Sequence, residues 1–190
     1  MINYDMIVKL AASMKKEYAG FSPEMIIRME GPQVLRYSMG NHPGALKGFI
    51  QKNNRCCTVV VNADLPGDIQ NKILFHELGH FKLGHTSSTR VCFLPDTSFS
   101  YRRDVTQSAR MENEANFFAA EYMLDTDETL EIIHEYDLVS AARILHVPIE
   151  FLDYKLRLLH KTRRLETYRD CFAIQSDCLL NMKTDGLSIG

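Results

Sequence analysis

The sequence predicts an α+β protein in which a small antiparallel sheet packs beside a long helix, followed by a helical C-terminal part. Three observations lead to this prediction. Apolar residues recur at helical spacing near the N-terminus, short β-rich runs separated by turn clusters follow, and the rest of the chain returns to helical spacing. With 190 residues, 45% of them hydrophobic and 24% charged, the chain is long enough for one compact domain with a small appendage.

Two helices are expected at the N-terminus. Residues 2–19 carry an apolar stripe at spacings typical of a helix, and Gly20 is a natural stop. Ser22 then provides an N-cap, and the proline after it suits the first position of a helix. A short second helix is therefore expected to run to about Glu30.

Three β-rich runs predict the strands of the sheet. They cover residues 34–37, 48–51 and 56–61. Turn-forming clusters at 40–44 and 52–55 separate the runs, so we expect antiparallel strands. The third run, CCTVVV, is apolar on both faces and is expected to be the most buried strand.

Helices are expected over most of the remaining chain. Residues 66–83 and 105–124 predict two long helices, separated by a Ser/Thr-rich loop at 86–104. Three short helices are expected beyond them, at 127–136, 139–145 and 148–160. The tail from Lys161 mixes basic residues with a Gly/Ser ending.

Composition and charge exclude several classes of protein. The net charge of −2 at pH 7 lacks the basic excess of non-specific nucleic-acid binders, and no apolar run approaches the roughly 18 residues of a membrane span. Five cysteines, an odd number without a CxxC pair, predict reduced thiols rather than a disulfide framework. The first 20 residues lack the basic and apolar regions of a secretion signal. We therefore expect a cytoplasmic protein that binds no membrane.

The motif His76-Glu77-Leu78-Gly79-His80 lies inside the helix expected over 66–83. Residues four apart lie one turn apart on the same face of a helix, so both imidazoles can reach one metal ion. Glu77 projects about 100° away, beside the ion, where a general base takes a proton from metal-bound water. The sequence therefore predicts a metal site with His76 and His80 as ligands and Glu77 as the catalytic base.

A third ligand is needed, because catalytic zinc takes three protein ligands and leaves one position for water. His85 lies beyond Gly84, where the helix is expected to have ended. We therefore expect His85 to cap that helix or to support a ligand. The better source is the helix expected over 105–124, which carries Glu112 and Glu114.

Close packing of the two long helices favours Glu112 as the third ligand. Glu112 shares its face with small residues, so its helix can approach the HExxH helix closely, whereas Glu114 shares its face with Phe118, which would hold the helices apart. Glu114 remains the alternative. Asn116 lies one turn after Glu112. We expect it to support one of the metal-binding side chains without binding the metal itself.

These residues predict one zinc ion per chain and hydrolysis of a peptide bond. Zinc lowers the pKa of its bound water towards about 7 and polarises the scissile carbonyl, while Glu77 takes the proton and passes it to the leaving amine. Tyr101 and Arg102, in the loop between the two motifs, are candidates for stabilising the tetrahedral intermediate.

The segment HELGHFKLGH, followed by ENEANFFAAEYML, resembles the ImmA/IrrE family of zinc metallopeptidases, whose pattern is HExxH and then ExxAN-x-FA on the next long helix. The resemblance spans about residues 1–125. It implies a minimal zincin-like fold in which His76, His80 and Glu112 bind zinc and Glu77 is the catalytic base. The chain continues YMLD where the family usually has LLMP, which affects how the helix ends rather than the ligands.

The resemblance also implies an anti-repressor protease. Such an enzyme cleaves a helix-turn-helix repressor and thereby switches on mobile-element or stress genes. A second hypothesis is a zinc-containing regulatory module that binds a repressor without cleaving it.

We divide the chain into a metallopeptidase domain (1–125), a helical subdomain (126–161) and a C-terminal tail (162–190). The subdomain has the outline of a helix-turn-helix. Its second helix begins with apolar and acidic residues, whereas a recognition helix offers basic or amide side chains near its start. We therefore expect it to pack on the catalytic part rather than to bind DNA, with basic residues such as Lys155 on a solvated face.

Overall fold

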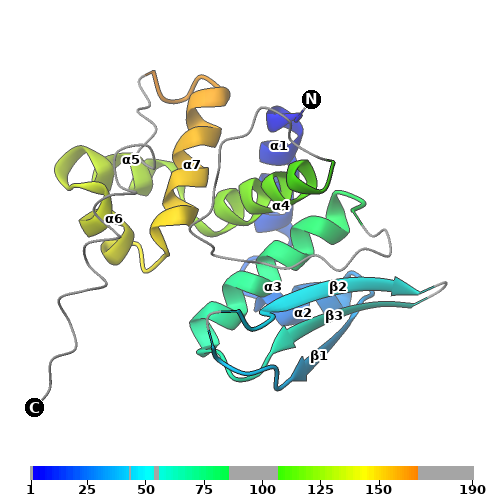
Figure 1. Cartoon of the computed structure of the whole chain (residues 1–190). Coiled ribbons are helices and arrows are strands. Elements are labelled where there is room, and N and C mark those ends of the chain that lie inside the picture. The colour runs from blue at the N-terminus through cyan, green and yellow to red at the C-terminus, as the bar shows by residue number, and fades with distance from the viewer. Residues whose placement is uncertain (1, 43, 54–55, 86–106, 167–190) are drawn as a thin grey trace, which may run out of the picture.

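The computed structural model describes residues 2–42, 44–53, 56–85 and 107–166 of the chain. In this part the fold is α+β, as predicted, with a small sheet on one side and helices over the rest (Figure 1). Helix α3 (Gly67–Lys82) lies between the sheet and helix α4 (Gln107–Met123). This layered arrangement places the HExxH motif at the centre of the molecule. The predicted loop at 86–104, with Tyr101 and Arg102, lies outside the described residues, as does most of the predicted tail.

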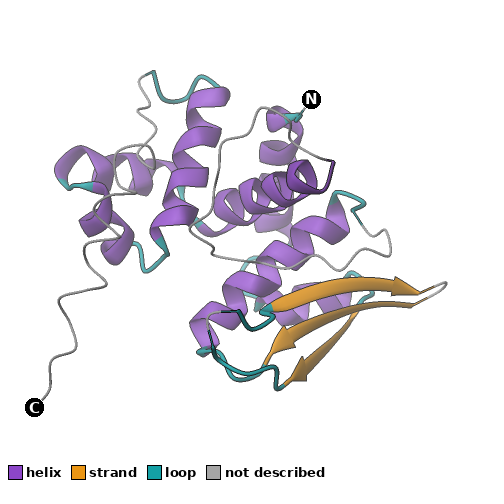
Figure 2. Cartoon of the chain, viewed as in Figure 1, coloured by secondary structure: helices purple, strands orange, loops and turns teal. Residues whose placement is uncertain are grey.

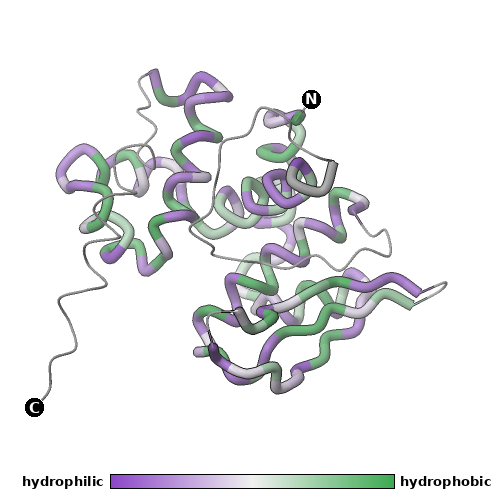
Figure 3. The backbone as a smooth tube through the Cα atoms, in the orientation of Figure 1, coloured by the Kyte–Doolittle hydropathy of each residue, from purple (hydrophilic) through white to green (hydrophobic). Residues whose placement is uncertain are grey.

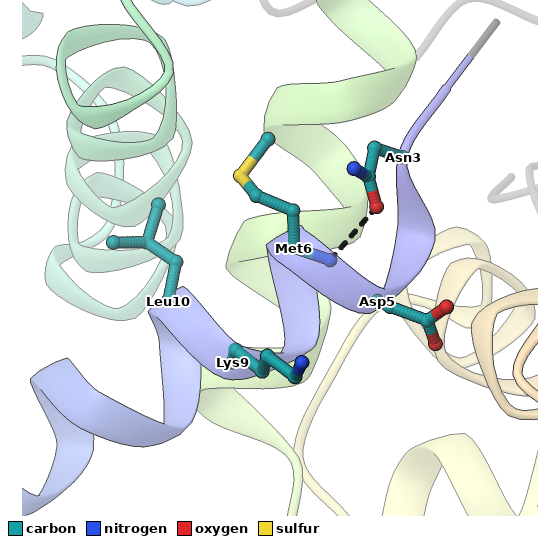
Figure 4. A pocket seen from close by; sticks show the side chains of 5 residues that line it. All are labelled: Asn3, Asp5, Met6, Lys9 and Leu10. Atoms are coloured by element: carbon teal, nitrogen blue, oxygen red, sulfur yellow. Dashed lines mark hydrogen bonds between the residues drawn. The ribbon is translucent and has the colours of Figure 1, made fainter.

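The two N-terminal helices form as predicted. Helix α1 (Tyr4–Glu17) begins at Asn3, whose side-chain Oδ1 accepts a hydrogen bond from the backbone N–H of Met6 at 3.0 Å (Figure 4). Helix α2 (Pro23–Met29) begins after Ser22, which caps it, with proline at the first helical position. Helix α1 packs on α4 and α2 packs on α3, so both helices support the two long ones.

Three strands form one sheet in the order β1-β3-β2 (Figure 2). They are β1 (Gln33–Tyr37), β2 (Gly48–Asn53) and β3 (Cys56–Asn62). Strands β2 and β3 are antiparallel, but β1 runs parallel to β3. The prediction of an antiparallel sheet is therefore wrong for β1. Strand β3 lies between β1 and β2 in the sheet, so β1 pairs with β3 and not with β2, the next strand in the chain. Strand β3 is central, in agreement with its apolar sequence.

Asn62 at the end of β3 holds the chain that passes from β1 towards β2. Its side chain is fully buried, and Nδ2 donates to the carbonyl oxygens of Gly40 and Leu46 at 2.7 and 2.9 Å. Its Oδ1 accepts from the backbone N–H of Met39 at 3.2 Å. These hydrogen bonds satisfy backbone groups in the connection between β1 and β2, which lie outside the strands. They thereby hold this connection at the end of β3.

The two long helices approach each other closely at Gly79. A Cβ atom on Gly79 would lie 3.0 Å from Cδ1 of Phe118 and 3.1 Å from the backbone oxygen of Ala115. Only a residue without a side chain leaves room for this contact. The small fourth residue of the HELGH motif, Gly79, thus determines how closely α4 packs on α3.

The C-terminal helices are α5 (Thr126–Glu135), α6 (Leu138–Ile144) and α7 (Ile149–Lys161), close to the predicted ranges. A hydrophobic cluster that includes Ala141, Leu152 and Leu156 holds them together. Helix α7 also packs on α4. Hydrophilic and hydrophobic residues alternate along these helices, as expected for elements that bury one face (Figure 3).

Lys155 corrects the prediction of a solvated basic face. It is fully buried, and its Nζ lies 2.7 Å from Oε2 of Glu121 and 3.0 Å from Oγ1 of Thr126. Arg164 lies 3.3 Å from the other carboxylate oxygen of Glu121. The spacing of charges in α7 could not reveal this, because the partner carboxylate is on α4.

No helix in the described part of the chain is long and apolar enough to cross a bilayer.

Candidate metal centre

Helix α3 presents two buried histidines at one point. His76 and His80 are fully buried, and their Nε2 atoms lie 3.0 Å apart. Their positions differ by one helical turn, which the sequence spacing predicted. The two ring nitrogens therefore converge on one position beside α4.

Helix α4 brings a carboxylate to the same position. The Oε2 atom of Glu112 lies 3.3 Å from Nε2 of His76, and its Oε1 lies 3.5 Å from Nε2 of His80. These three residues offer ligand atoms that all lie within 4.8 Å of one another. The close contact at Gly79 makes this possible, since it holds α4 against α3 one turn from Glu112.

Glu114, the alternative ligand, lies elsewhere. Its Oε2 is 3.0 Å from Nε2 of His85, and its Oε1 accepts a hydrogen bond from Arg110. The structure thus brings Glu112, and not Glu114, to the two motif histidines. The prediction that Phe118 would hold the two helices apart is wrong. Its ring packs directly against Gly79, which has no side chain.

Each histidine has a hydrogen-bond partner on its outer nitrogen. Nδ1 of His76 lies 2.8 Å from Oδ1 of Asn116, and Nδ1 of His80 lies 3.1 Å from Nδ1 of His85. With a proton on each Nδ1, both Nε2 atoms can offer a lone pair to a metal ion bound between the histidines and Glu112. Asn116 and His85 each contact a motif histidine, in agreement with the supporting roles expected for them. The sequence did not predict the hydrogen bond between His85 and Glu114.

Glu77 lies beside this cluster in an unusual environment. The residue is fully buried, and neither carboxylate oxygen has a hydrogen-bond partner of good geometry among the described residues. Burial raises the pKa of Glu77 well above its usual value, and the charge of Glu112 raises it further, while the backbone of Ile50 opposes the rise. A buried carboxyl group without a partner is costly, so the presence of one beside this cluster indicates a chemical role.

The donor set fits a catalytic divalent metal. Burial lowers the pKa of His80 to about 4, so the imidazole is neutral at pH 7 and offers a lone pair. Burial would raise the pKa of Glu112, but the two histidines outweigh this and lower it to about 2, so it is a carboxylate. Two imidazoles and one carboxylate form the ligand set of zinc hydrolases, which leaves a position open for water.

The fold and this cluster together define a class of protein. A small sheet beside a helix that carries HExxH, with a carboxylate from the next helix, is a zincin-like metallopeptidase fold. More particularly, the chain belongs to the M78 peptidase family, described as the IrrE N-terminal-like domain, whose model matches residues 28–157. The match runs from α2 through the metal centre into α7. No curated protein matches the chain.

Proposed function

We propose that the protein is a zinc-dependent endopeptidase. The observation that carries this proposal is Glu77, a buried carboxyl group without a hydrogen-bond partner of good geometry among the described residues, next to two histidines and a carboxylate that converge on one point. His76, His80 and Glu112 would hold one zinc ion. When bound, zinc supplies a Lewis acid that acidifies water and polarises a carbonyl group.

The role of Glu77 follows from its surroundings. A raised pKa makes the carboxylate of Glu77 a stronger base than a solvated glutamate, so it takes up a proton more readily. Glu77 therefore accepts a proton from the attacking water and delivers it to the nitrogen of the leaving amine. Because no described residue binds its oxygens firmly, the carboxyl group is free to serve both steps.

The position of strand β2 favours an extended peptide as the substrate. Strand β2 is at the edge of the sheet, and no strand in the described residues pairs with its outer side. A Cβ on Gly48, the first residue of β2, would lie 3.7 Å from Oε1 of Glu77. A peptide that adds to this edge would pass close to Glu77.

The substrate we propose is a regulatory protein, such as a helix-turn-helix repressor, in the cytoplasm. This follows from the resemblance to anti-repressor proteases. The helical part is proposed to help bind the protein substrate, and no direct contact with nucleic acid is expected.

The substitution Glu77→Gln tests the proposal, because it removes the base and retains nearly the same shape. Zinc content is measured in the wild type, in Glu77→Gln and in His80→Ala, and cleavage of the repressor encoded nearest to the gene is followed on gels. We expect one zinc per chain in the first two proteins and loss of zinc in His80→Ala. Cleavage by Glu77→Gln should fall by about 10²–10⁴-fold.

Two outcomes would contradict the proposal. Full cleavage by zinc-loaded Glu77→Gln would exclude Glu77 as the base. Retention of the intact repressor by the zinc-loaded wild type, with no cleavage of it or of unfolded casein, would favour a binding module.

A further inference from the structure

The orientation of one amide group decides whether His76 can bind a metal. The Nε2 atom of His76 faces Glu112, so the ring proton must sit on Nδ1 for Nε2 to offer its lone pair. Nδ1 lies 2.8 Å from Oδ1 of Asn116. Asn116 must therefore present its oxygen, and not its NH₂ group, to the histidine.

An asparagine amide can turn over, and its two orientations have almost the same shape. The turned orientation would place NH₂ against Nδ1 of His76, and it would favour the tautomer with the proton on Nε2. That tautomer cannot bind a metal through Nε2. Some other group must therefore hold the amide of Asn116 in place.

Tyr154 of helix α7 is that group. Its hydroxyl accepts a hydrogen bond from the side chain of Asn116, which opposes the rise that burial causes in the tyrosine pKa. The hydroxyl also donates to Oδ1 of Asn113 at 3.2 Å. Because its proton is committed to Asn113, the tyrosine oxygen can only accept from Asn116. The NH₂ group of Asn116 is thereby directed to Tyr154 and its oxygen to His76.

The tyrosine ring is held firmly enough to direct the amide. Tyr154 is 6% exposed, and its ring meets that of Phe117 edge to face, with 5.2 Å between the centroids. Asn116 is also buried, with 8% of its surface exposed. A buried amide must satisfy its donors, and here the tyrosine oxygen satisfies one of them.

We propose that Tyr154 is a positioning residue of the metal centre: through Asn116 it holds His76 in the tautomer that binds zinc. This inference rests on the proposed zinc site. The helical part of the chain would then belong to the metal centre. Helix α7 supplies the hydroxyl that orients Asn116 of α4, and Asn116 in turn orients His76 of α3.

The first test is the affinity for Zn²⁺ of Tyr154→Phe in the full chain, measured by competition with a chromophoric chelator. Removal of an outer partner of a metal-binding histidine typically costs 10–100-fold in affinity, and we expect about 10-fold. Tyr122→Phe is the matched control, since Tyr122 is a buried tyrosine of α4 that packs on Phe75 and Phe118. Its affinity should stay within twofold of the wild type.

Asn116→Asp provides a test that a merely structural role would not pass. A carboxylate presents an oxygen to His76 in either orientation, so it does not need Tyr154 to orient it. In the Asn116→Asp background, Tyr154→Phe should therefore change the zinc affinity by less than twofold. This comparison cancels the effect of the added charge, because both proteins carry it.

Asn113→Ala is a second route to the same link and does not alter the tyrosine. Without its acceptor, the Tyr154 hydroxyl can donate to the oxygen of Asn116 and favour the turned amide, so we expect a several-fold loss of zinc affinity.

The outcomes separate this inference from the proposed function. Failure of the wild type to bind zinc would overturn both. Zinc binding by the wild type, with the zinc affinities of Tyr154→Phe and Asn113→Ala within twofold of it, would overturn the role of Tyr154 alone. A loss of affinity that persists in the Asn116→Asp background would overturn it as well.

Discussion

Two regions of the molecule bury a glutamate, and they differ in whether its charge is compensated. Between α4 and α7, Glu121 is 7% exposed and is bound by Lys155 at 2.7 Å and Arg164 at 3.3 Å. In α3, Glu77 is fully buried and has no cation or firm hydrogen-bond donor among the described residues. The same residue type thus has its charge compensated in one region and left uncompensated in the other.

The difference distinguishes structural burial from functional burial. A buried ion pair is tolerated because each charge replaces the water that the other has lost, and it specifies how two helices meet. A buried carboxyl group without a partner stabilises nothing, so its cost must be offset elsewhere. Glu121 and Lys155 thus join the helical part to α4, whereas the proposed role of Glu77 is proton transfer.

The largest effect on stability is expected from Lys155→Met. The variant leaves Glu121 buried without its nearest cation, while Arg164 and Lys15 still interact with it. Breaking such a buried pair typically costs about 3–5 kcal/mol in the free energy of unfolding. Urea denaturation measures this loss. The exposed Lys161→Met is the control, with an expected change within about 0.5 kcal/mol.

A second substitution sharpens this prediction. Adding Glu121→Gln to Lys155→Met removes the buried charge that has lost its nearest cation, so the double variant should recover more than half of the lost stability. If the double variant were less stable than Lys155→Met, Glu121 would not be the group that the lysine compensates.

An intermediate effect is expected from Gly79→Ala. Alanine is the better helix former by about 1 kcal/mol, but its Cβ would lie 3.0–3.2 Å from Phe118 and from backbone atoms of Ala115. Backbone cannot move aside as a flexible side chain does, so we expect a net loss of about 1–3 kcal/mol. Glu112 would shift away from the histidines, and zinc affinity should fall with stability.

The control for this prediction is Gly67→Ala in the same helix. A Cβ there meets nothing within 4 Å, so its stability should be equal to that of the wild type or slightly higher. An increase in stability for Gly79→Ala, with zinc affinity unchanged, would show that the two helices do not depend on this close contact.

A smaller effect, of opposite sign, is expected from Glu77→Gln on the metal-free protein. Burial, followed by the charge of Glu112, raises the pKa of Glu77 above 4.5 in the folded state, so the folded state holds the proton more tightly than the unfolded state. The wild type should therefore lose stability relative to Glu77→Gln as the pH rises from about 4.5 through the raised pKa. Denaturation in the presence of a chelator, at several pH values, should show a gain for the variant on the order of 1 kcal/mol at high pH. If the free energies of unfolding of the wild type and Glu77→Gln changed with pH in the same way, the Glu77 carboxyl group would be solvated.

The sequence by itself determined much of the fold and part of the candidate site. Local spacing places His76 and His80 on one face of a helix, because a turn of 3.6 residues is a property of the backbone alone. The helices were predicted in the same way, from apolar periodicity and from caps such as Ser22. The three strands were recognised, since their composition and turn clusters are local features.

Only the tertiary structure decided what depends on two elements meeting. The parallel direction of β1 follows from the insertion of β3 beside it, which no local pattern reports. Lys155 and Tyr154 lie on a helix whose charges and rings look ordinary in sequence, and they acquire their roles from Glu121 and Asn116 on α4. Periodicity describes one helix at a time, whereas a buried ion pair, a directed amide and a metal centre require contacts between residues far apart in the chain.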